Sequence, residues 1–239
     1  MAQTIFERVE EKYLLDAAQL RAVQNGLIGR MQPDPFGRST VLSLYYDTED
    51  YRLIRTSLDK PDYKEKLRVR AYGAPGKESP VFVELKKKVD GVVYKRRAEL
   101  TLTEADDFFA GKPIEKDTQV LREIRYFLDF YRPEPRVFLS YRRVAYVGQE
   151  QGLRITFDDG IRFRTNALML TSGAWGKEMM PAGQTLMEIK ALGAMPLWLC
   201  DLLAHNGIFP ESFSKYGTCY RDFLFPGLTR AEKGAVCYA

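Results

Sequence analysis

Charged and apolar side chains alternate along many short stretches of this chain. In KLRVRAY, Lys66, Arg68 and Arg70 would share one face of a strand, and Leu67 and Val69 would share the other. The same period of two recurs in the segments 8–12, 81–88, 94–100, 141–146, 153–157 and 187–190. Strands that bury one face and keep the other polar are typical of antiparallel sheets.

Other stretches carry apolar residues at helical spacing. They predict helices over residues 16–31, 104–110, 118–131 and 196–207. We expect Asp16 and Thr103 to cap the first two, and Pro196 to open the last.

Hairpin turns are expected at Asp90-Gly91 and near Asp158–Gly160. The pattern then gives about eight strands and three or four helices, without an internal repeat or a Pro/Gly/Ser linker. We therefore predict an α+β fold dominated by an antiparallel sheet, built as a single domain over residues 1–239.

The polar face of these strands is mostly positive. Its cations are Arg8, Lys12, Lys66, Arg68, Arg70, Lys86, Lys88, Lys95, Arg97, Arg143, Arg154 and Lys190, and its acids are Glu10, Glu84, Glu99 and Glu188. The whole chain carries only +4. A merely solvated face mixes the two signs, because like charges on neighbouring strands repel. Since the amphipathic helices need the apolar strand faces as cover, we expect an eight-stranded antiparallel β-barrel with helices packed outside and a cationic lumen.

A cationic lumen requires a polyanion, because confined and unpaired cations are costly. Phosphate suits converging Lys and Arg, since Arg donates bidentately and Lys acts as a point charge. Most Tyr and Phe residues fall on the apolar faces, so no nucleic-acid partner is expected. Glu10 and Glu188 could face the lumen, where Mg²⁺ or Mn²⁺ would bridge a carboxylate and phosphate oxygens.

Other residue types narrow the chemistry further. His205 is the only histidine and ends a predicted helix, which removes His-based triads, Cys–His dyads and zinc–histidine sites. Cys200, Cys219 and Cys237 are widely spaced, as in proteins of reducing compartments. The first residues lack the apolar stretch of a signal peptide, and no apolar run reaches membrane-spanning length. We therefore expect a cytoplasmic protein.

Nine short motifs of the chain resemble those of a known family. They are RVEEKY, YYDT, KLRVRAY, VELKKK, YKRR, YRRVAY, LRITFDD, LMEIKA and FSKYG. From about Phe6 to Tyr220 the chain resembles the VTC domain, the catalytic domain of the vacuolar transporter chaperone polyphosphate polymerase, which also occurs as a stand-alone bacterial protein. This family belongs to the triphosphate tunnel metalloenzyme superfamily, with the CYTH phosphatases and RNA triphosphatases. The resemblance implies a tunnel that binds ATP and polyphosphate or triphosphate with Mn²⁺ or Mg²⁺ and passes the γ-phosphate of ATP to a polyphosphate chain.

The resemblance also implies roles for single residues. Candidate phosphate contacts, including neighbours on the same charged face, are Lys12, Arg68, Arg70, Lys86, Lys95, Arg97, Tyr141, Arg143, Arg154, Lys190, Ser214 and Lys215. The expected catalytic residues are Arg68, Arg70, Lys86, Arg143 and Glu188. Glu188 matches the metal ligand of the family, and Glu10 is its expected helper.

Two positions depart from related patterns. Arg8 stands where the CYTH motif has its first acid, which favours the VTC branch, and Ser212 stands where the polymerase pattern has a Lys. Three functions therefore stay open: a metal-dependent polyphosphate polymerase, a tripolyphosphatase or triphosphatase, and a non-enzymatic polyanion sensor. Coupling of synthesis to transport would need a membrane-protein partner, and the sequence leaves the oligomeric state open.

Overall fold

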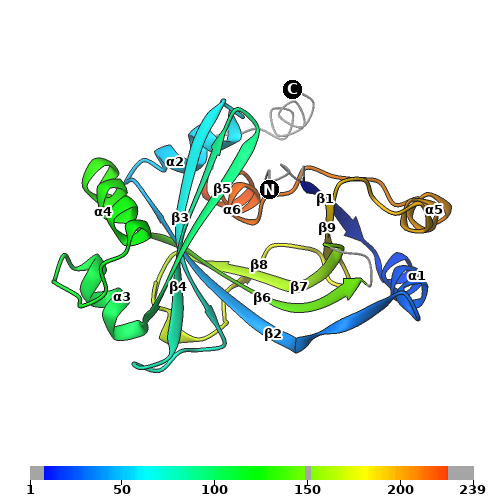
Figure 1. The fold of residues 1–239 in the computed structure, drawn as a ribbon, viewed down its shortest axis with the longest axis horizontal. Helices are drawn as coiled ribbons and strands as arrows, with labels where there is room; N and C mark the ends of the chain where they lie inside the picture. Colours follow the sequence, from blue (N-terminus) through cyan, green and yellow to red (C-terminus); the bar gives the residue numbers. More distant parts are fainter. Residues whose placement is uncertain (1–7, 149–151, 226–239) are drawn as a thin grey trace, which may run out of the picture. The chain divides into compact units, whose positions relative to one another are not determined.

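A computed structural model describes residues 8–148 and 152–225 (Figure 1). The strands are β1 (Arg8–Leu15), β2 (Met31–Asp47), β3 (Tyr63–Tyr72), β4 (Pro80–Val89), β5 (Val92–Thr101), β6 (Glu134–Gly148), β7 (Arg154–Arg164), β8 (Lys177–Glu178) and β9 (Thr185–Leu192). The helices are α1 (Ala17–Leu27), α2 (Arg52–Leu58), α3 (Leu102–Phe109), α4 (Gln119–Tyr131), α5 (Leu197–His205) and α6 (Lys215–Cys219), with a 3₁₀ turn at Leu170–Ser172 and a π-helical turn at Tyr220–Leu224.

One sheet contains all nine strands. Hydrogen-bonded neighbours follow the order β1-β9-β7-β6-β2-β3-β4-β5, and the two-residue β8 pairs with β7. The pairs β1–β9, β2–β3, β3–β4, β4–β5 and β7–β9 are antiparallel. The predicted α+β fold dominated by an antiparallel sheet is confirmed. Among residues 8–148 and 152–225 the sheet does not close into the expected eight-stranded barrel, because β1 and β5 are the two ends of the hydrogen-bonded path and do not pair with each other.

The chain divides into two compact units. Of the described residues, unit 1 takes in 8–39, 141–148, 152–161 and 178–213, and unit 2 takes in 40–140, 162–177 and 214–225. The long strands β2, β6 and β7 each contribute a part to both. The single domain expected over residues 1–239 stays a prediction.

In unit 1, helices cover the apolar face of the sheet. Residues such as Tyr13, Ile155 and Ile189 alternate with charged neighbours and pack into a buried cluster with Val23 of α1 and Leu199 of α5. Asp16 caps α1 as predicted, because its carboxylate accepts the backbone N–H groups of residues 18 and 19. The charged side chains of β1, β7 and β9 therefore lie on the opposite face.

Unit 2 repeats this arrangement. Leu67, Val83 and Leu85 pack with Ile124 and Phe127 of α4 into a second buried cluster. Figure 1 shows α3 and α4 beside the hairpin of β4 and β5, which they contact. The two covered faces confirm that α1, α3, α4 and α5 pack on the apolar side of the strands.

The Asp90-Gly91 turn is confirmed. Both residues have positive φ, 47° and 83°, which lets a two-residue turn join β4 and β5. The turn expected near Asp158–Gly160 is wrong, because β7 runs unbroken through it. Gly160 has φ 57° within that strand, a local distortion that a glycine absorbs without reversing the chain.

Two helix ends also differ from expectation. The first helix ends at Leu27 and not near Met31, because Gly29 takes φ 75° and Met31 begins β2. The cap of α3 is Thr101 and not Thr103, because a capping box joins Thr101 to Glu104. Glu104 Oε2 accepts the Thr101 N–H at 2.7 Å, and Thr101 Oγ1 accepts the Glu104 N–H at 3.1 Å.

No helix of residues 8–148 and 152–225 is both long enough and apolar enough to cross a membrane.

The two threonines provide a matched test of the cap. We expect Thr101→Ala to lower the free energy of unfolding by about 1 kcal/mol, because the N–H of Glu104 loses its acceptor. Thr103→Ala removes only an exposed hydrogen bond to the Lys77 carbonyl and should cost less than about 0.5 kcal/mol. Urea unfolding of both variants measures the difference, and an equal or reversed cost would contradict the assignment of the cap.

Candidate functional site

Cations from three neighbouring strands lie in register on the polar face of unit 2. Lys66, Lys86 and Lys95 are paired side by side across β3, β4 and β5, and we call them the lysine row. The next row along the strands is Arg68, Glu84 and Arg97, to which β2 adds Tyr45. Arg70 follows one row further, opposite Ser43 and Phe82. We call this surface the cationic face of unit 2.

Glu84 is the centre of this face. Its side chain is only 2% exposed. Its carboxylate contacts Arg68 at 2.7 Å, Lys95 at 2.9 Å, Arg97 at 2.5 Å and Arg70 at 3.9 Å. Burial alone would raise the pKa of Glu84, but Arg68, Arg70 and Lys95 outweigh burial and hold the pKa well below its usual range.

Glu84 reaches the lysine row through Lys95, at 2.9 Å. Lys86 is exposed, and Lys66 donates to the Ser214 hydroxyl at 3.4 Å. Three ammonium groups in adjacent register repel one another, so an anion placed over them would be stabilising.

Helix α6 meets this same face. Ser214 caps it, Tyr216 stacks on Tyr45 with ring centroids 4.6 Å apart, and the Tyr216 hydroxyl donates to buried Asp47 at 2.8 Å. Burial would raise the pKa of Tyr45, but neighbouring cations lower it, with Arg68 first and Lys215 among them. The structure therefore brings Ser214 and Lys215 to the cationic face of unit 2.

Unit 1 carries a polar face of mixed sign. Lys12 of β1 pairs in register with Glu188 of β9, and Glu10 pairs with Lys190. The Lys190 ammonium lies 3.2 Å from Glu188 and 3.7 Å from Glu10, so both carboxylates converge on one cation.

The arginines of unit 1 are bound to buried acids. Arg143 makes a bidentate pair with Asp158 at 2.6 and 2.7 Å, lies 3.8 Å from Glu188 and covers the ring of Tyr141 at 5.2 Å. Burial would lower the pKa of Arg143, but the bond to Asp158 and the other neighbours raise it. Arg154 donates to Asp34 at 2.8 Å.

Comparison with known proteins places this arrangement in a family. The VTC domain model matches residues 7–224. The chain belongs to the VTC domain family. No curated protein sequence matches it.

Solved structures share the fold of this VTC domain. A proposed adenylate cyclase from Bacillus halodurans is 16% identical with a TM-score of 0.57, over 90% of this chain and 97% of that one. A proposed adenylyl cyclase from Hippeastrum, which shows a dominant triphosphatase activity, is 16% identical with a TM-score of 0.53, over 92% of this chain and 98% of that one. These likenesses show that the chain shares its fold with the two proteins, and this fold fits the triphosphate tunnel type that the sequence resemblance implied.

The residues of unit 1 fit a divalent cation that also binds phosphate. Carboxylate oxygens are the ligands that Mg²⁺ and Mn²⁺ prefer, and Mg²⁺ often takes only one or two of them beside phosphate and water. Glu188 and Glu10 provide two, although no group of three or more His, Cys, Asp or Glu that could hold a metal occurs in residues 8–148 and 152–225. Thr156, opposite Glu188 on β7, has a buried hydroxyl without a hydrogen-bond partner. This unsatisfied oxygen is a polar atom beside Glu188 that a bound ligand could satisfy.

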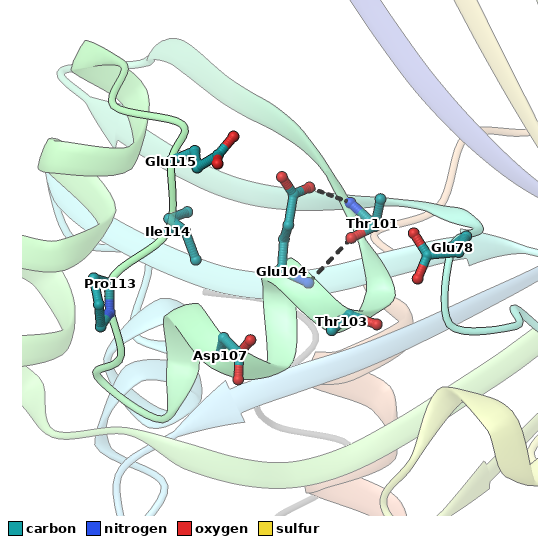
Figure 2. A pocket seen from close by; sticks show the side chains of 8 residues that line it. All are labelled: Glu78, Thr101, Thr103, Glu104, Asp107, Pro113, Ile114 and Glu115. Carbon is teal, nitrogen blue, oxygen red and sulfur yellow. Dashed lines mark hydrogen bonds between the residues drawn. The ribbon is translucent and has the colours of Figure 1, made fainter.

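The hollow in unit 2 that Figure 2 shows has the opposite charge. It lies between α3 and the segment after it, has a volume of about 300 Å³, and is lined by Glu78, Glu104, Asp107 and Glu115 among others. Glu104 serves the cap of α3, and Asp107 pairs with Lys112 at 2.8 Å. Four carboxylates would repel a polyphosphate, so the cationic face is the better candidate for binding one.

The structure gathers the predicted site residues into two groups. Unit 2 holds Arg68, Arg70, Lys86, Lys95, Arg97, Ser214 and Lys215, and unit 1 holds Glu10, Lys12, Tyr141, Arg143, Arg154, Glu188 and Lys190. The sequence prediction did not assign roles to Glu84, Asp158, Asp34 and Thr156. The sequence did contain a signal for Glu84 and Thr156. Both alternate with apolar neighbours along their strands and therefore fall on the charged face.

Removal of the Glu84 charge should lower the stability of the fold and increase the stabilisation that a bound anion provides. We expect Glu84→Gln to lose about 3 kcal/mol of unfolding free energy, because a neutral amide then faces four cations. Tripolyphosphate should raise the Tm of the variant more than that of the wild type, since it replaces the missing negative charge. Thermal unfolding at pH 7 with and without tripolyphosphate tests both expectations. Glu123→Gln, at an exposed pair with Arg96, is the control and should show neither effect.

The wild type and Glu84→Gln should differ less in unfolding free energy at acidic pH. The folded pKa of Glu84 lies below its unfolded value of about 4.3, so its stabilising contribution is present above that pH and is lost as the pH falls toward the folded value. The gap in unfolding free energy between wild type and Glu84→Gln should therefore narrow from pH 6 to pH 3. A gap that stays constant over this range would contradict the pairing.

Proposed function

We propose that this VTC domain binds linear polyphosphate and ATP on the cationic face of unit 2 and transfers the γ-phosphate of ATP to the polyphosphate chain. The observation that carries the proposal is the lysine row beside arginines that are already fixed by Glu84. Arginines that are already held in place can donate two hydrogen bonds to a phosphate at little cost in conformational entropy. The lysines add positive charge along the path of the successive phosphates. A cytoplasmic location of the protein and a membrane-protein partner are also part of this proposal.

The residues of unit 1 would hold the metal ion. Glu188 and Glu10 supply carboxylate oxygens, and Thr156 supplies a hydroxyl. When bound there, Mg²⁺ or Mn²⁺ would neutralise negative charge on phosphate oxygens.

The chain itself contributes positioning and charge neutralisation, which make up most of the catalysis of phosphoryl transfer. The end of a polyphosphate chain is already an oxyanion and can attack without a general base, whereas water must lose a proton. Glu84 is a poor base, because its pKa is held low by the surrounding cations. This favours transfer to phosphate over hydrolysis on the cationic face of unit 2.

Hydrolysis is the second candidate. The Hippeastrum protein shares the fold and shows triphosphatase activity, and Ser212 removes one cation of the polymerase pattern. Incubation with ATP and Mn²⁺, followed by gel analysis of the products, separates the possibilities. Long polyphosphate supports the polymerase, free phosphate alone supports the hydrolase, and binding without turnover supports the sensor.

The cationic face can be tested by charge removal. We expect Arg70→Ala to weaken tripolyphosphate binding by about 10-fold or more, because one charge-assisted contact of about 1.5–3 kcal/mol is lost. Lys86→Ala should also weaken binding, and its exposed position separates this effect from a folding defect. Arg122→Ala, on the surface of α4, is the control and should bind normally. Equal titration curves for all three variants would mean that the face is only solvated.

Glu188 separates a catalyst from a sensor. We expect Glu188→Gln to abolish Mn²⁺-dependent turnover of ATP and to leave metal-free polyphosphate binding unchanged or slightly tighter, since a repelling charge is removed. Glu11 lies on the opposite face of β1 from Glu10, so Glu11→Gln is the control and should keep the Mn²⁺-dependent turnover. Turnover against Mn²⁺ concentration and melting temperature are measured on the same preparations. Unchanged turnover with a lower melting temperature would show that Glu188 serves only its pairs with Lys190 and Arg143.

A further inference from the structure

An aromatic side chain ends the cationic face of unit 2. Tyr72 lies two residues beyond Arg70 on β3, so both side chains lie on the same face of the strand. Tyr72 is 50% exposed, although it lies beside buried Arg70. At the end of this face that lies farthest from the lysine row, β3 therefore presents an aromatic ring. The preceding positions on the same face, Lys66, Arg68 and Arg70, present cations.

The ring of Tyr72 is held in place by its neighbours. It meets Phe82 of β4 edge to face, with centroids 5.8 Å apart and planes at 73°. Arg97 lies over the Phe82 ring at 4.5 Å. Burial would raise the pKa of Tyr72, but the positive groups of Arg70 and Arg97 beside its hydroxyl lower it. An exposed ring with so many contacts is preorganised and loses little freedom when it binds a ligand.

We propose that Tyr72, supported by Phe82, is a stacking surface for the nucleobase of a nucleoside triphosphate. The proposal rests on the function proposed above. The phosphates would then begin near Arg70 and extend along β3 past Arg68 and Arg97 in the direction of the lysine row.

The spacing of the strand supports this orientation. Residues two apart on an antiparallel strand are separated by roughly 7 Å, so the ring, the arginines and the lysines succeed one another at similar steps. Every base has a flat face, so stacking on an aromatic ring accepts any nucleobase, whereas inorganic tripolyphosphate has none. The proposal therefore predicts that Tyr72 distinguishes nucleotides from inorganic polyphosphates.

The test compares two ligands on three variants by calorimetry without divalent metal. Tyr72→Ala should weaken ATP binding by about 10-fold, the usual effect of losing one stacked base, and change tripolyphosphate binding less than about twofold. Tyr72→Phe keeps the ring and should bind ATP within about threefold of wild type. Tyr63→Ala is the matched control: Tyr63 lies on the same strand, is 47% exposed and points to the other face, so both affinities should stay unchanged.

A second readout reports stacking directly. The fluorescence of 2-aminopurine riboside triphosphate should be quenched on binding to wild type and Tyr72→Phe, and quenched much less by Tyr72→Ala at saturation.

Each outcome decides between the proposals. Equal losses for ATP and tripolyphosphate in Tyr72→Ala would overturn the stacking surface and show that Tyr72 only holds the arginines. No loss for either ligand, or no ATP binding by the wild type, would also overturn it. Failure of the wild type to bind tripolyphosphate would instead overturn the function proposed for the cationic face.

Discussion

Neighbouring cations on adjacent strands repel one another, and a folded sheet that carries them is more stable where a negative group offsets the repulsion. In unit 2 that offset is the buried carboxylate of Glu84, which binds Arg68, Lys95 and Arg97 directly. A lone buried carboxylate would be costly, and so would the crowded cations, but each compensates the other. The hydrophobic cluster under β3, β4 and β5 can form only because the opposite face is electrostatically tolerable.

This constraint divides the polar face into two regions with different properties. The arginines around Glu84 are rigid and partly neutralised, whereas the lysine row retains an excess of positive charge. Rigid donors favour one geometry of a bound phosphate, and flexible lysines adapt to the next phosphate along the chain. Unit 1 differs, because Asp158 and Asp34 bind its arginines and its lysines are balanced by Glu10 and Glu188.

Period-two alternation predicted most of the strands and their two faces, and helical spacing predicted the helices that cover the apolar faces. Alternation also placed Arg68 and Arg70 of β3 on one face, and the register of β3 with β4 brings Lys86 to the same face. It could not select Glu84 as the common partner, because that depends on the exact register of three strands. Asp34 and Asp158 escaped prediction for the same reason, as each meets its arginine on a different strand. The cap at Thr101 and the unbroken course of β7 depend on local hydrogen bonds and one glycine conformation that composition does not reveal.

The anchoring of α6 has a consequence for how the protein acquires its function. Ser214 and Tyr216 reach partners 148 and 169 residues earlier in the chain, at Lys66 and Asp47. Contacts that span so much sequence form late, because the loop between them must first be ordered. During synthesis, β2 to β5 leave the ribosome well before this segment. Until the segment arrives, Lys66 lacks the Ser214 hydroxyl and Asp47 lacks the Tyr216 hydroxyl, so the last described part of the chain to be synthesised is the part that completes the binding face.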